Sequence, residues 1–175
     1  MKRLNFRFLL VLFIMLVAIP ACKSSDLLEP GATAPNVTLQ DQNGTPRDLA
    51  SFRGQPLLIY FYPKDATPGC TTEACSFRDV WENYEAARVA VVGVSVDDVA
   101  SHKAFAEEHS LPFPLLADTE AQLAGAFGLE KRLGMLPRVS FLIDAEGVIR
   151  AVYPDVDPGL HAAEVLEDVK RLNLG

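Results

Sequence analysis

The chain has 175 residues, of which 49% are apolar and 22% are charged, a balance that suits one globular domain with a hydrophobic core and excludes a wholly disordered protein. Its formal net charge at pH 7 is −7, so no nucleic-acid partner is expected. Two of its three cysteines, Cys70 and Cys75, lie five positions apart. Thiols this close in sequence can bind metal, form a bridge or react, and their surroundings distinguish these roles.

The amino terminus has the pattern of an export signal. Three basic residues among the first seven precede an unbroken apolar run over 8–19, which is too short to span a bilayer but suits the apolar part of a signal peptide. A buried helix is the alternative, but this run has no polar face and a polar stretch follows it. We therefore predict an export signal over 1–21, a tether over 22–30 and a folded domain over 31–175.

The residues Ile19-Pro20-Ala21-Cys22 resemble a bacterial lipoprotein processing site, in which the cysteine becomes the lipid-modified first residue. Pro20 departs from the usual small or hydroxylated residue, and ordinary cleavage near Ala21, leaving Cys22 as a free thiol, stays open. Removal of the three basic residues would change the net charge from −7 to −10, so we expect membrane attachment to come from the lipid. The resemblance implies a periplasmic or extracytoplasmic protein, whose thiols meet an oxidising environment.

From residue 31 onward, apolar runs alternate with amphipathic segments and no internal repeat is present, which indicates a mixed α/β domain. Asn-Gly at 43–44 favours a hairpin between strands at 37–39 and 47–49. A buried strand over 57–62 then leads through a Pro-Gly loop into a helix over 70–86. The first half of the domain is thus expected to place a helix directly after a buried strand.

The second half continues the alternation. A run rich in β-branched residues predicts a central strand, an Asp-Asp pair predicts a helix cap, and Glu-Gly at 146–147 predicts a second hairpin. The expected elements are a strand over 89–94, a helix over 99–109, a strand over 115–117, a helix over 120–127, strands over 139–143 and 148–153, and a helix over 158–172. This order predicts a thioredoxin-like α/β fold with an extra N-terminal β-hairpin and an inserted helix before the last hairpin.

Cys70 is the candidate nucleophile. A cysteine in the first turn of a helix faces unpaired backbone N–H groups and the positive end of the helix dipole, which favour its thiolate form. Pro63 keeps the preceding loop from becoming helical and can shield the thiolate from water. Thr67 can offer its hydroxyl to the thiolate or to a bound peroxide oxygen, while Pro68 and Gly69 suit a tight helix entry.

The segment Thr-Pro-Gly-Cys-Thr-Thr-Glu-Ala-Cys-Ser-Phe-Arg-Asp at 67–79 is similar to the peroxiredoxin Q, or bacterioferritin comigratory protein, branch of the peroxiredoxins. The resemblance runs from about residue 31 to residue 172. It includes Ser-Val-Asp-Asp at 95–98 and Arg-Val-Ser-Phe-Leu-Ile-Asp at 138–144. A fold alone does not establish an activity, so the functional inference depends on the cysteine-containing motif.

The resemblance implies a thiol-dependent peroxidase that reduces hydrogen peroxide and organic hydroperoxides. In that family pattern Cys70 matches the peroxidatic cysteine and Cys75 the resolving one, while Pro63, Thr67 and Arg138 complete the active site. The expected reductant is a thioredoxin-like or other dithiol donor. No cofactor is expected, and the resemblance to this branch favours a monomer.

Arg138 also has a physical rationale of its own. A permanent positive charge at the start of a strand can stabilise a thiolate and polarise the oxygen that becomes negative as the O–O bond breaks. A lone arginine is more often a solvated surface charge, and here the neighbouring motif favours the functional interpretation by analogy.

The spacing of Cys70 and Cys75 predicts a motion. Residues five apart in an α-helix have Cα atoms about 8.6 Å apart, whereas a disulfide needs less than about 7 Å. The first turns of the helix must therefore unwind before the two sulfurs can join. A one-cysteine mechanism, with Cys75 as a small core residue, stays open.

Other polar residues carry weaker signals. We expect Glu73 to be an exposed helical carboxylate, and His102, His109 and His161 show no metal-ligand spacing. Two other classes of protein remain as alternatives, a membrane-tethered thiol-disulfide reductase and a copper-delivery protein. The first would need two intervening residues and the second three, whereas this chain has four between its paired cysteines.

Overall fold

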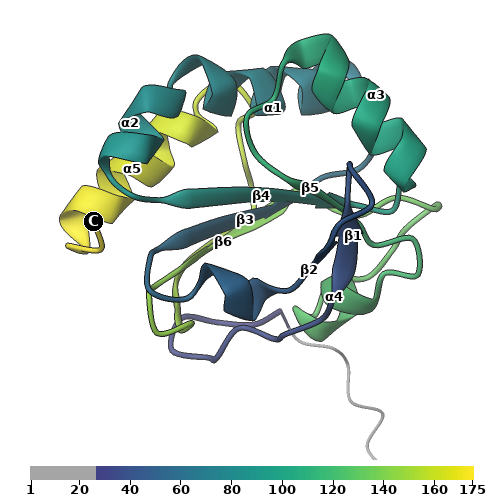
Figure 1. The fold of residues 1–175 in the computed structure, drawn as a ribbon. Coiled ribbons are helices and arrows are strands. Elements are labelled where there is room, and N and C mark those ends of the chain that lie inside the picture. The colour runs from purple at the N-terminus through teal and green to yellow at the C-terminus, as the bar shows by residue number, and fades with distance from the viewer. Residues whose placement is uncertain (1–26) are drawn as a thin grey trace, which may run out of the picture.

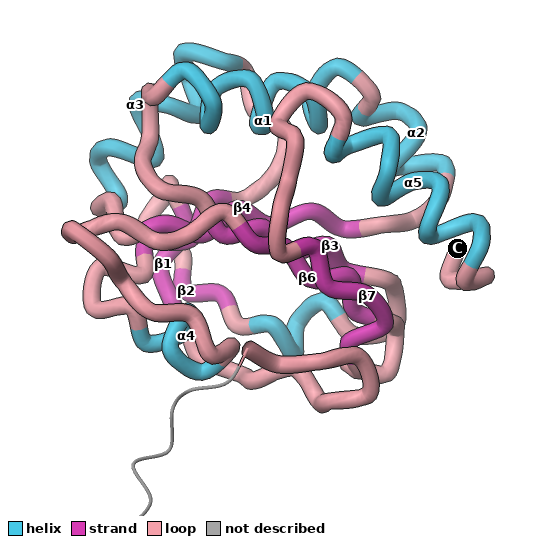
Figure 2. The backbone as a smooth tube through the Cα atoms, turned by 180° about the vertical axis from the view of Figure 1, so that it is seen from behind, coloured by secondary structure: helices cyan, strands magenta, loops and turns pink. Residues whose placement is uncertain are grey.

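The computed structural model describes residues 27–175, so the predicted export signal, Cys22 and the first part of the predicted tether lie outside it. Its strands form one seven-stranded sheet in the order β2-β1-β5-β4-β3-β6-β7. Figure 2 shows β1 and β2 toward one edge of this sheet and β7 at the other. The strands are β1 (Leu39–Asp41), β2 (Pro46–Arg47), β3 (Leu57–Phe61), β4 (Ala90–Ser95), β5 (Leu115–Ala117), β6 (Val139–Ile143) and β7 (Ile149–Tyr153).

Helices cover both faces of the sheet unequally. The helices are α1 (Pro68–Asp79), α2 (Trp81–Ala86), α3 (Val99–His109), α4 (Gln122–Ala126) and α5 (His161–Arg171), with a short 3-10 helix η1 at Leu49–Phe52. Figure 1 shows α1, α2, α3 and α5 on one face of the sheet and α4 on the other. This architecture confirms the predicted thioredoxin-like fold, including the extra β1–β2 hairpin and the inserted α4 before the β6–β7 hairpin.

The core follows from the alternation of side chains along β3, an interior strand of the sheet between β4 and β6. All five of its residues are buried. Leu58 and Tyr60 point into the cluster beneath α1, α2, α3 and α5, whereas Ile59 and Phe61 join the cluster on the α4 face. A strand buried on both faces reads as a continuous apolar run, which is why the sequence revealed it.

The register of β3 brings distant segments together at one end of the sheet, where β3 and β4 finish and β6 begins. β3 runs parallel to β4 and antiparallel to β6, and Phe61 at its end lies opposite Val94 near the end of β4 and Val139 at the start of β6. The loop after β3, the loop after β4 and the residue before β6 therefore emerge together. Both Cys70 and Arg138 lie at this end of the sheet.

The first hairpin differs from its predicted position. β1 covers Leu39–Asp41 rather than 37–39, and it ends at Asp41 because this residue closes the turn by accepting hydrogen bonds from the backbone N–H groups of Asn43 and Thr45. Residue Leu49, expected in the second strand, instead starts η1, which Asp48 caps by accepting from the N–H of Ser51 at 2.8 Å.

The helix predicted over 70–86 is two helices. α1 begins two residues earlier than predicted, with Pro68 in its first turn. The helix is interrupted at Val80, where φ is −114°. After the break, Tyr84 in α2 donates its hydroxyl to the carbonyl of Ala162 in α5 at 2.9 Å. Such a contact between distant segments outweighs the helix propensity that made one long helix the expectation.

Two other helices are shorter than predicted. α4 covers 122–126 because the buried carboxylate of Asp118 accepts from the N–H groups of Gln122, Leu123 and Ala124, which sets where the helix starts. α5 begins at His161 rather than 158, because the side chain of Asp157 holds the N–H of Gly159 in a turn before it.

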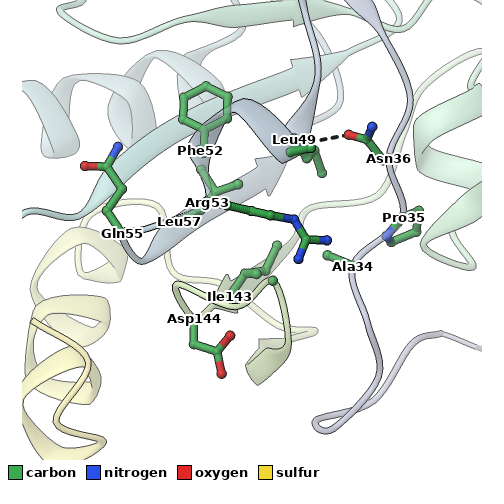
Figure 3. A pocket seen from close by; sticks show the side chains of 12 residues that line it. Ala34, Pro35, Asn36, Leu49, Phe52, Arg53, Gln55, Leu57, Ile143 and Asp144 are labelled. Carbon is green, nitrogen blue, oxygen red and sulfur yellow. Dashed lines mark hydrogen bonds between the residues drawn. The ribbon is translucent and has the colours of Figure 1, made fainter.

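A small pocket lies on the α4 face, away from Cys70. It is lined by Leu49, Leu57 and Ile143, and the side chain of Arg53 reaches across it (Figure 3). Arg53 donates to the carbonyl of Glu146 at 2.5 Å, which ties η1 to the β6–β7 turn. In the described part of the chain, no helix has the length and apolar character needed to cross a membrane.

Candidate active site

Cys70 lies in the first turn of α1 and is 1% exposed. The guanidinium of Arg138, in the residue before β6, donates from Nη2 to its Sγ at 3.3 Å. The helix start also directs backbone N–H groups toward this position. The structure thus brings the predicted nucleophile and the predicted arginine into contact, although 68 positions separate them in sequence.

Arg138 has a second partner in Glu73, and the two side chains form an ion pair through Nη1 and Oε2. Glu73 is fully buried, so the expectation of an exposed helical carboxylate is wrong. The reason is helix geometry, because residues three apart share one face and Cys70 already occupies the face that packs on the sheet. That spacing of three was the signal available in the sequence.

Burial and pairing act in opposite directions on this cluster. Burial raises the pKa of Glu73 from 4.5 to about 7, against the lowering influence of the Arg138 charge and hydrogen bond. Burial opposes the charge of Arg138 too, but Glu73 and Cys70 outweigh it and raise the pKa of Arg138 above its ordinary value. Arg138 therefore keeps its charge, and its donors are shared between the Cys70 sulfur and the carboxyl group of Glu73.

The raised pKa of Glu73 predicts a pH-dependent stability. Between pH 4.5 and about 7 the folded protein binds more protons at Glu73 than the unfolded chain does, so this contribution to stability is present below pH 4.5 and lost as the pH rises through 7. The shift corresponds to about 3 kcal/mol at most. Urea unfolding from pH 4.5 to 8 should show the wild type losing stability relative to Glu73→Gln by up to that amount as the pH rises.

The comparison with Glu73→Gln isolates this residue, since other titrating groups are shared by both proteins. One of them is His161, whose pKa is lowered to about 4 by burial and by the nearby Arg138 charge. A stability difference that stays constant across the pH range would contradict the assignment.

Gly69 allows Arg138 to sit where it does. A Cβ atom built on Gly69 would lie 3.2 Å from Nη2 of Arg138, closer than an ordinary contact. Glycine at this position is therefore explained by the close approach of the guanidinium to the helix start. The sequence had indicated only a tight turn here.

Pro63 and Thr67 lie in the loop between β3 and α1, at the same end of the sheet as Cys70. Pro63 is half-buried, and Thr67 is the residue that caps α1. The hydroxyl of Thr67 donates to the carbonyl of Lys64 at 3.1 Å and makes no capping bond to the helix. Donation to a peroxide oxygen would require this hydroxyl to rotate.

Cys75 is half-buried, and both it and Cys70 are free thiols within the continuous helix α1. The structure therefore keeps the two cysteines at the helical spacing from which unwinding was predicted. Among residues 27–175, no three His, Cys, Asp or Glu side chains gather in a way that could hold a metal ion.

Two of the histidines are more than polar surface residues. His102 is fully buried on α3, on the side that also buries Phe105 and Ala106, three and four positions later. His161 is fully buried too, and its Nε2 lies 2.9 Å from the hydroxyl of Ser140. The apolar neighbours of His102 at helical spacing were the signal that could have identified its burial.

Comparisons with known proteins agree with this site. The AhpC/TSA family matches residues 30–152 of the chain. Chloroplastic peroxiredoxin Q from Triticum aestivum is 43% identical over 145 residues, covering 81% of this chain and 67% of the relative. This match spans the whole region that carries the two cysteines and Arg138.

Solved structures are similar over the same region. The peroxidoxin BcpB of Mycobacterium tuberculosis has a TM-score of 0.78 and 34% identity, with 83% of this chain and 98% of that chain covered. The bacterioferritin comigratory protein of Xanthomonas campestris, which has alkyl peroxide reduction activity, has a TM-score of 0.74 and 34% identity, with 84% and 98% covered.

These matches do not favour the thiol-disulfide reductase or the copper-delivery protein. The resemblance seen in the cysteine motif is confirmed over most of the chain, on a fold that carries a buried thiol against an arginine. The chain therefore belongs to the AhpC/TSA family and is a thiol-dependent peroxidase of the peroxiredoxin Q branch.

Proposed function

We propose that Cys70 is the peroxidatic residue and Cys75 the resolving one. The Cys70 thiolate attacks one oxygen of a hydroperoxide, the O–O bond breaks, and the other oxygen leaves as water or an alcohol after taking up a proton. Cys70 is thereby oxidised to a sulfenic acid. The Cys75 thiol then displaces water from this group and forms a disulfide, which a dithiol donor reduces by thiol-disulfide exchange.

The contact that carries this proposal is the hydrogen bond from Arg138 Nη2 to Cys70 Sγ at 3.3 Å. A charge-assisted donor favours the thiolate over the thiol, and it can move to the departing oxygen as negative charge develops there. Glu73 holds the same guanidinium from its other side. The arginine is therefore positioned before substrate arrives, which lowers the cost of reorganising the site.

Resolution requires α1 to open. Cys70 and Cys75 lie in one unbroken helix from Pro68 to Asp79, and five residues of helix separate Cα atoms by about 8.6 Å, beyond the reach of a disulfide. Local unwinding between them is thus a step of the proposed cycle. The break at Val80, which ends α1, leaves α2 in place as a separate helix behind the segment that must open.

The test is peroxide oxidation of the purified protein followed by mass mapping of the disulfide, compared with the Cys75→Ser variant. We expect a bond between residues 70 and 75 in the wild type. Cys75→Ser should consume one equivalent of peroxide at the wild-type rate but lose about ten-fold or more of its turnover with a thioredoxin-type donor. Unchanged turnover would show that Cys75 does not resolve the sulfenic acid.

The substrates we propose are hydrogen peroxide and organic hydroperoxides. The support for the organic class is the alkyl peroxide reduction activity of the similar Xanthomonas campestris protein. We propose a thioredoxin-like dithiol as the reductant, since the intramolecular disulfide of the cycle is a substrate for such donors. The protein is proposed to act as a monomer.

We also propose that the protein is exported and held by a lipid on Cys22 at the extracytoplasmic face of a membrane. The support is the basic and apolar pattern over 1–21 with the lipoprotein-like site before Cys22. Intact-mass measurement of the mature protein tests this proposal. A chain that begins at Cys22 with a lipid-sized mass addition is expected, and an unmodified Cys22 would overturn it.

A further inference from the structure

A second buried polar network lies beside the active-site loop, apart from the cluster of Cys70, Arg138 and Glu73. Its centre is His102 on α3, which is fully buried. Nδ1 of His102 lies 2.9 Å from Oδ2 of Asp65, and Nε2 lies 3.2 Å from the carbonyl oxygen of Leu116. A carbonyl can only accept, so Nε2 carries a proton and donates it to Leu116.

Asp65 is the partner of Nδ1. Burial acts to raise the pKa of Asp65, but hydrogen bonds from His102, Ser101 and Tyr62 outweigh this and lower the pKa below its ordinary value. His102 on α3 and Asp65 in the loop after β3 are therefore a buried hydrogen-bonded pair.

Further hydrogen bonds hold both carboxylate oxygens of Asp65. Tyr62 donates its hydroxyl to Oδ1 at 2.8 Å, and Ser101 donates to Oδ2 at 2.7 Å. The backbone N–H of Asp65 donates to Oδ2 of Asp97, which also accepts from the hydroxyl of Ser95 at 2.7 Å. The loop after β3 is thus tied to the end of β4 and to α3, elements that need not move when α1 opens.

Asp65 lies next to a residue of the loop that has a left-handed backbone conformation. Ala66, the next residue, has φ of 55°, a left-handed conformation that costs a non-glycine residue about 1 kcal/mol. Thr67 follows and caps α1, and its carbonyl accepts from the N–H of Thr71. Anchoring Asp65 therefore determines where the helix start, and with it Cys70, is placed.

A buried polar pair is weak evidence for stability, since its desolvation cost can exceed its attraction. A placement role accounts better for such a pair at this position. On the proposed catalytic cycle, we propose that His102 is a positioning residue for the peroxidase reaction: its hydrogen bond with Asp65 holds residues 64–67 in place, so that Cys70 meets peroxide in the reactive geometry while the helix beyond it remains free to unwind.

This role separates two steps of the cycle. Oxidation of Cys70 needs the ordered loop and helix start, whereas formation of the disulfide needs their opening. Loss of the anchor should slow the first step and leave the second no slower. A purely structural role would lower the melting temperature without separating the two rates.

The experiment measures both rates by stopped flow, using the fluorescence of Trp81, the one tryptophan of the chain, which starts α2 directly after α1. His102→Gln and Asp65→Asn are each expected to lower the second-order rate constant for Cys70 oxidation by about ten-fold. The double variant should be no slower than either single variant, because His102 acts through Asp65. The rate of disulfide formation should stay within two-fold or rise.

Asp118→Asn is the matched control. It replaces a buried carboxylate with an amide and so weakens the cap of α4, which lies on the other face of the sheet. It should lower the melting temperature and leave the oxidation rate unchanged. If His102→Gln does not fold, Ser101→Ala removes only the bond to Oδ2 of Asp65 and is expected to slow oxidation by about three-fold.

The outcomes separate this inference from the proposed cycle. Wild-type oxidation rates in His102→Gln, or in Ser101→Ala where His102→Gln is unfolded, would overturn the positioning role. So would additive losses in the double variant, or an equal loss in Asp118→Asn. A wild-type protein that does not oxidise Cys70 with peroxide would instead refute the proposed cycle.

Discussion

Cys70→Ser is expected to abolish peroxidase turnover, with a loss of at least about 10³-fold in kcat/KM for hydrogen peroxide. Serine keeps the size of the side chain and the bond from Arg138 Nη2, but its hydroxyl is not ionised near neutral pH and cannot accept an oxygen atom from peroxide. Steady-state peroxide consumption with a dithiol donor measures the effect.

The fold should survive this change, because the replacement is nearly isosteric and Cys70 lies at a helix end. Its melting temperature is expected within a few degrees of the wild-type value. Cys75→Ser serves as the matched control, since it removes a thiol from the same helix yet should still react once with peroxide. Substantial turnover in Cys70→Ser would assign the nucleophile to another residue.

Arg138→Met is expected to lose both activity and stability. The thiolate loses its charged donor, and the departing oxygen loses the positive charge that stabilises it, which together should lower kcat/KM by about 10² to 10³-fold. Fully buried Glu73 would be left without its partner, at a cost of about 3 kcal/mol near neutral pH. Urea unfolding and peroxide kinetics on the same samples measure the two losses.

A second substitution separates these effects. Adding Glu73→Met to Arg138→Met removes the unpaired carboxyl group, so most of the lost stability should return while the activity stays low. Recovery of activity along with stability would show that Arg138 serves only to neutralise Glu73. Arg138→Lys should be intermediate, because a single ammonium cannot replace the planar fork that reaches both Cys70 and Glu73.

Cys70 and Arg138 differ in how much of their role a local sequence pattern could predict. The helix start at Cys70 was predicted because Pro68, Gly69 and the preceding buried strand are contiguous in sequence. Arg138 was assigned only by resemblance, because nothing near it in the chain indicates its partner. The antiparallel pairing of β3 with β6, with Phe61 opposite Val139, is what brings it to the thiol.

Burial was the property that the sequence predicted least well. Glu73 and His102 were assigned to solvent or left without a role because each is polar and lies on a helix, yet both are fully buried against charged partners. A helix pattern shows which residues share a face, but the charge that compensates a buried polar group comes from another segment.

The sequence by itself determined the order of strands and helices and the position of Cys70 at a helix start, since these depend on the periodicity and turn residues of neighbouring positions. The tertiary structure alone decided that Arg138 and Glu73 meet at Cys70, that His102 pairs with Asp65, and that the long helix breaks at Val80. These features arise where sheet register and packing bring together segments that lie far apart in the chain, because only the folded chain brings such charges and carbonyls within hydrogen-bonding distance.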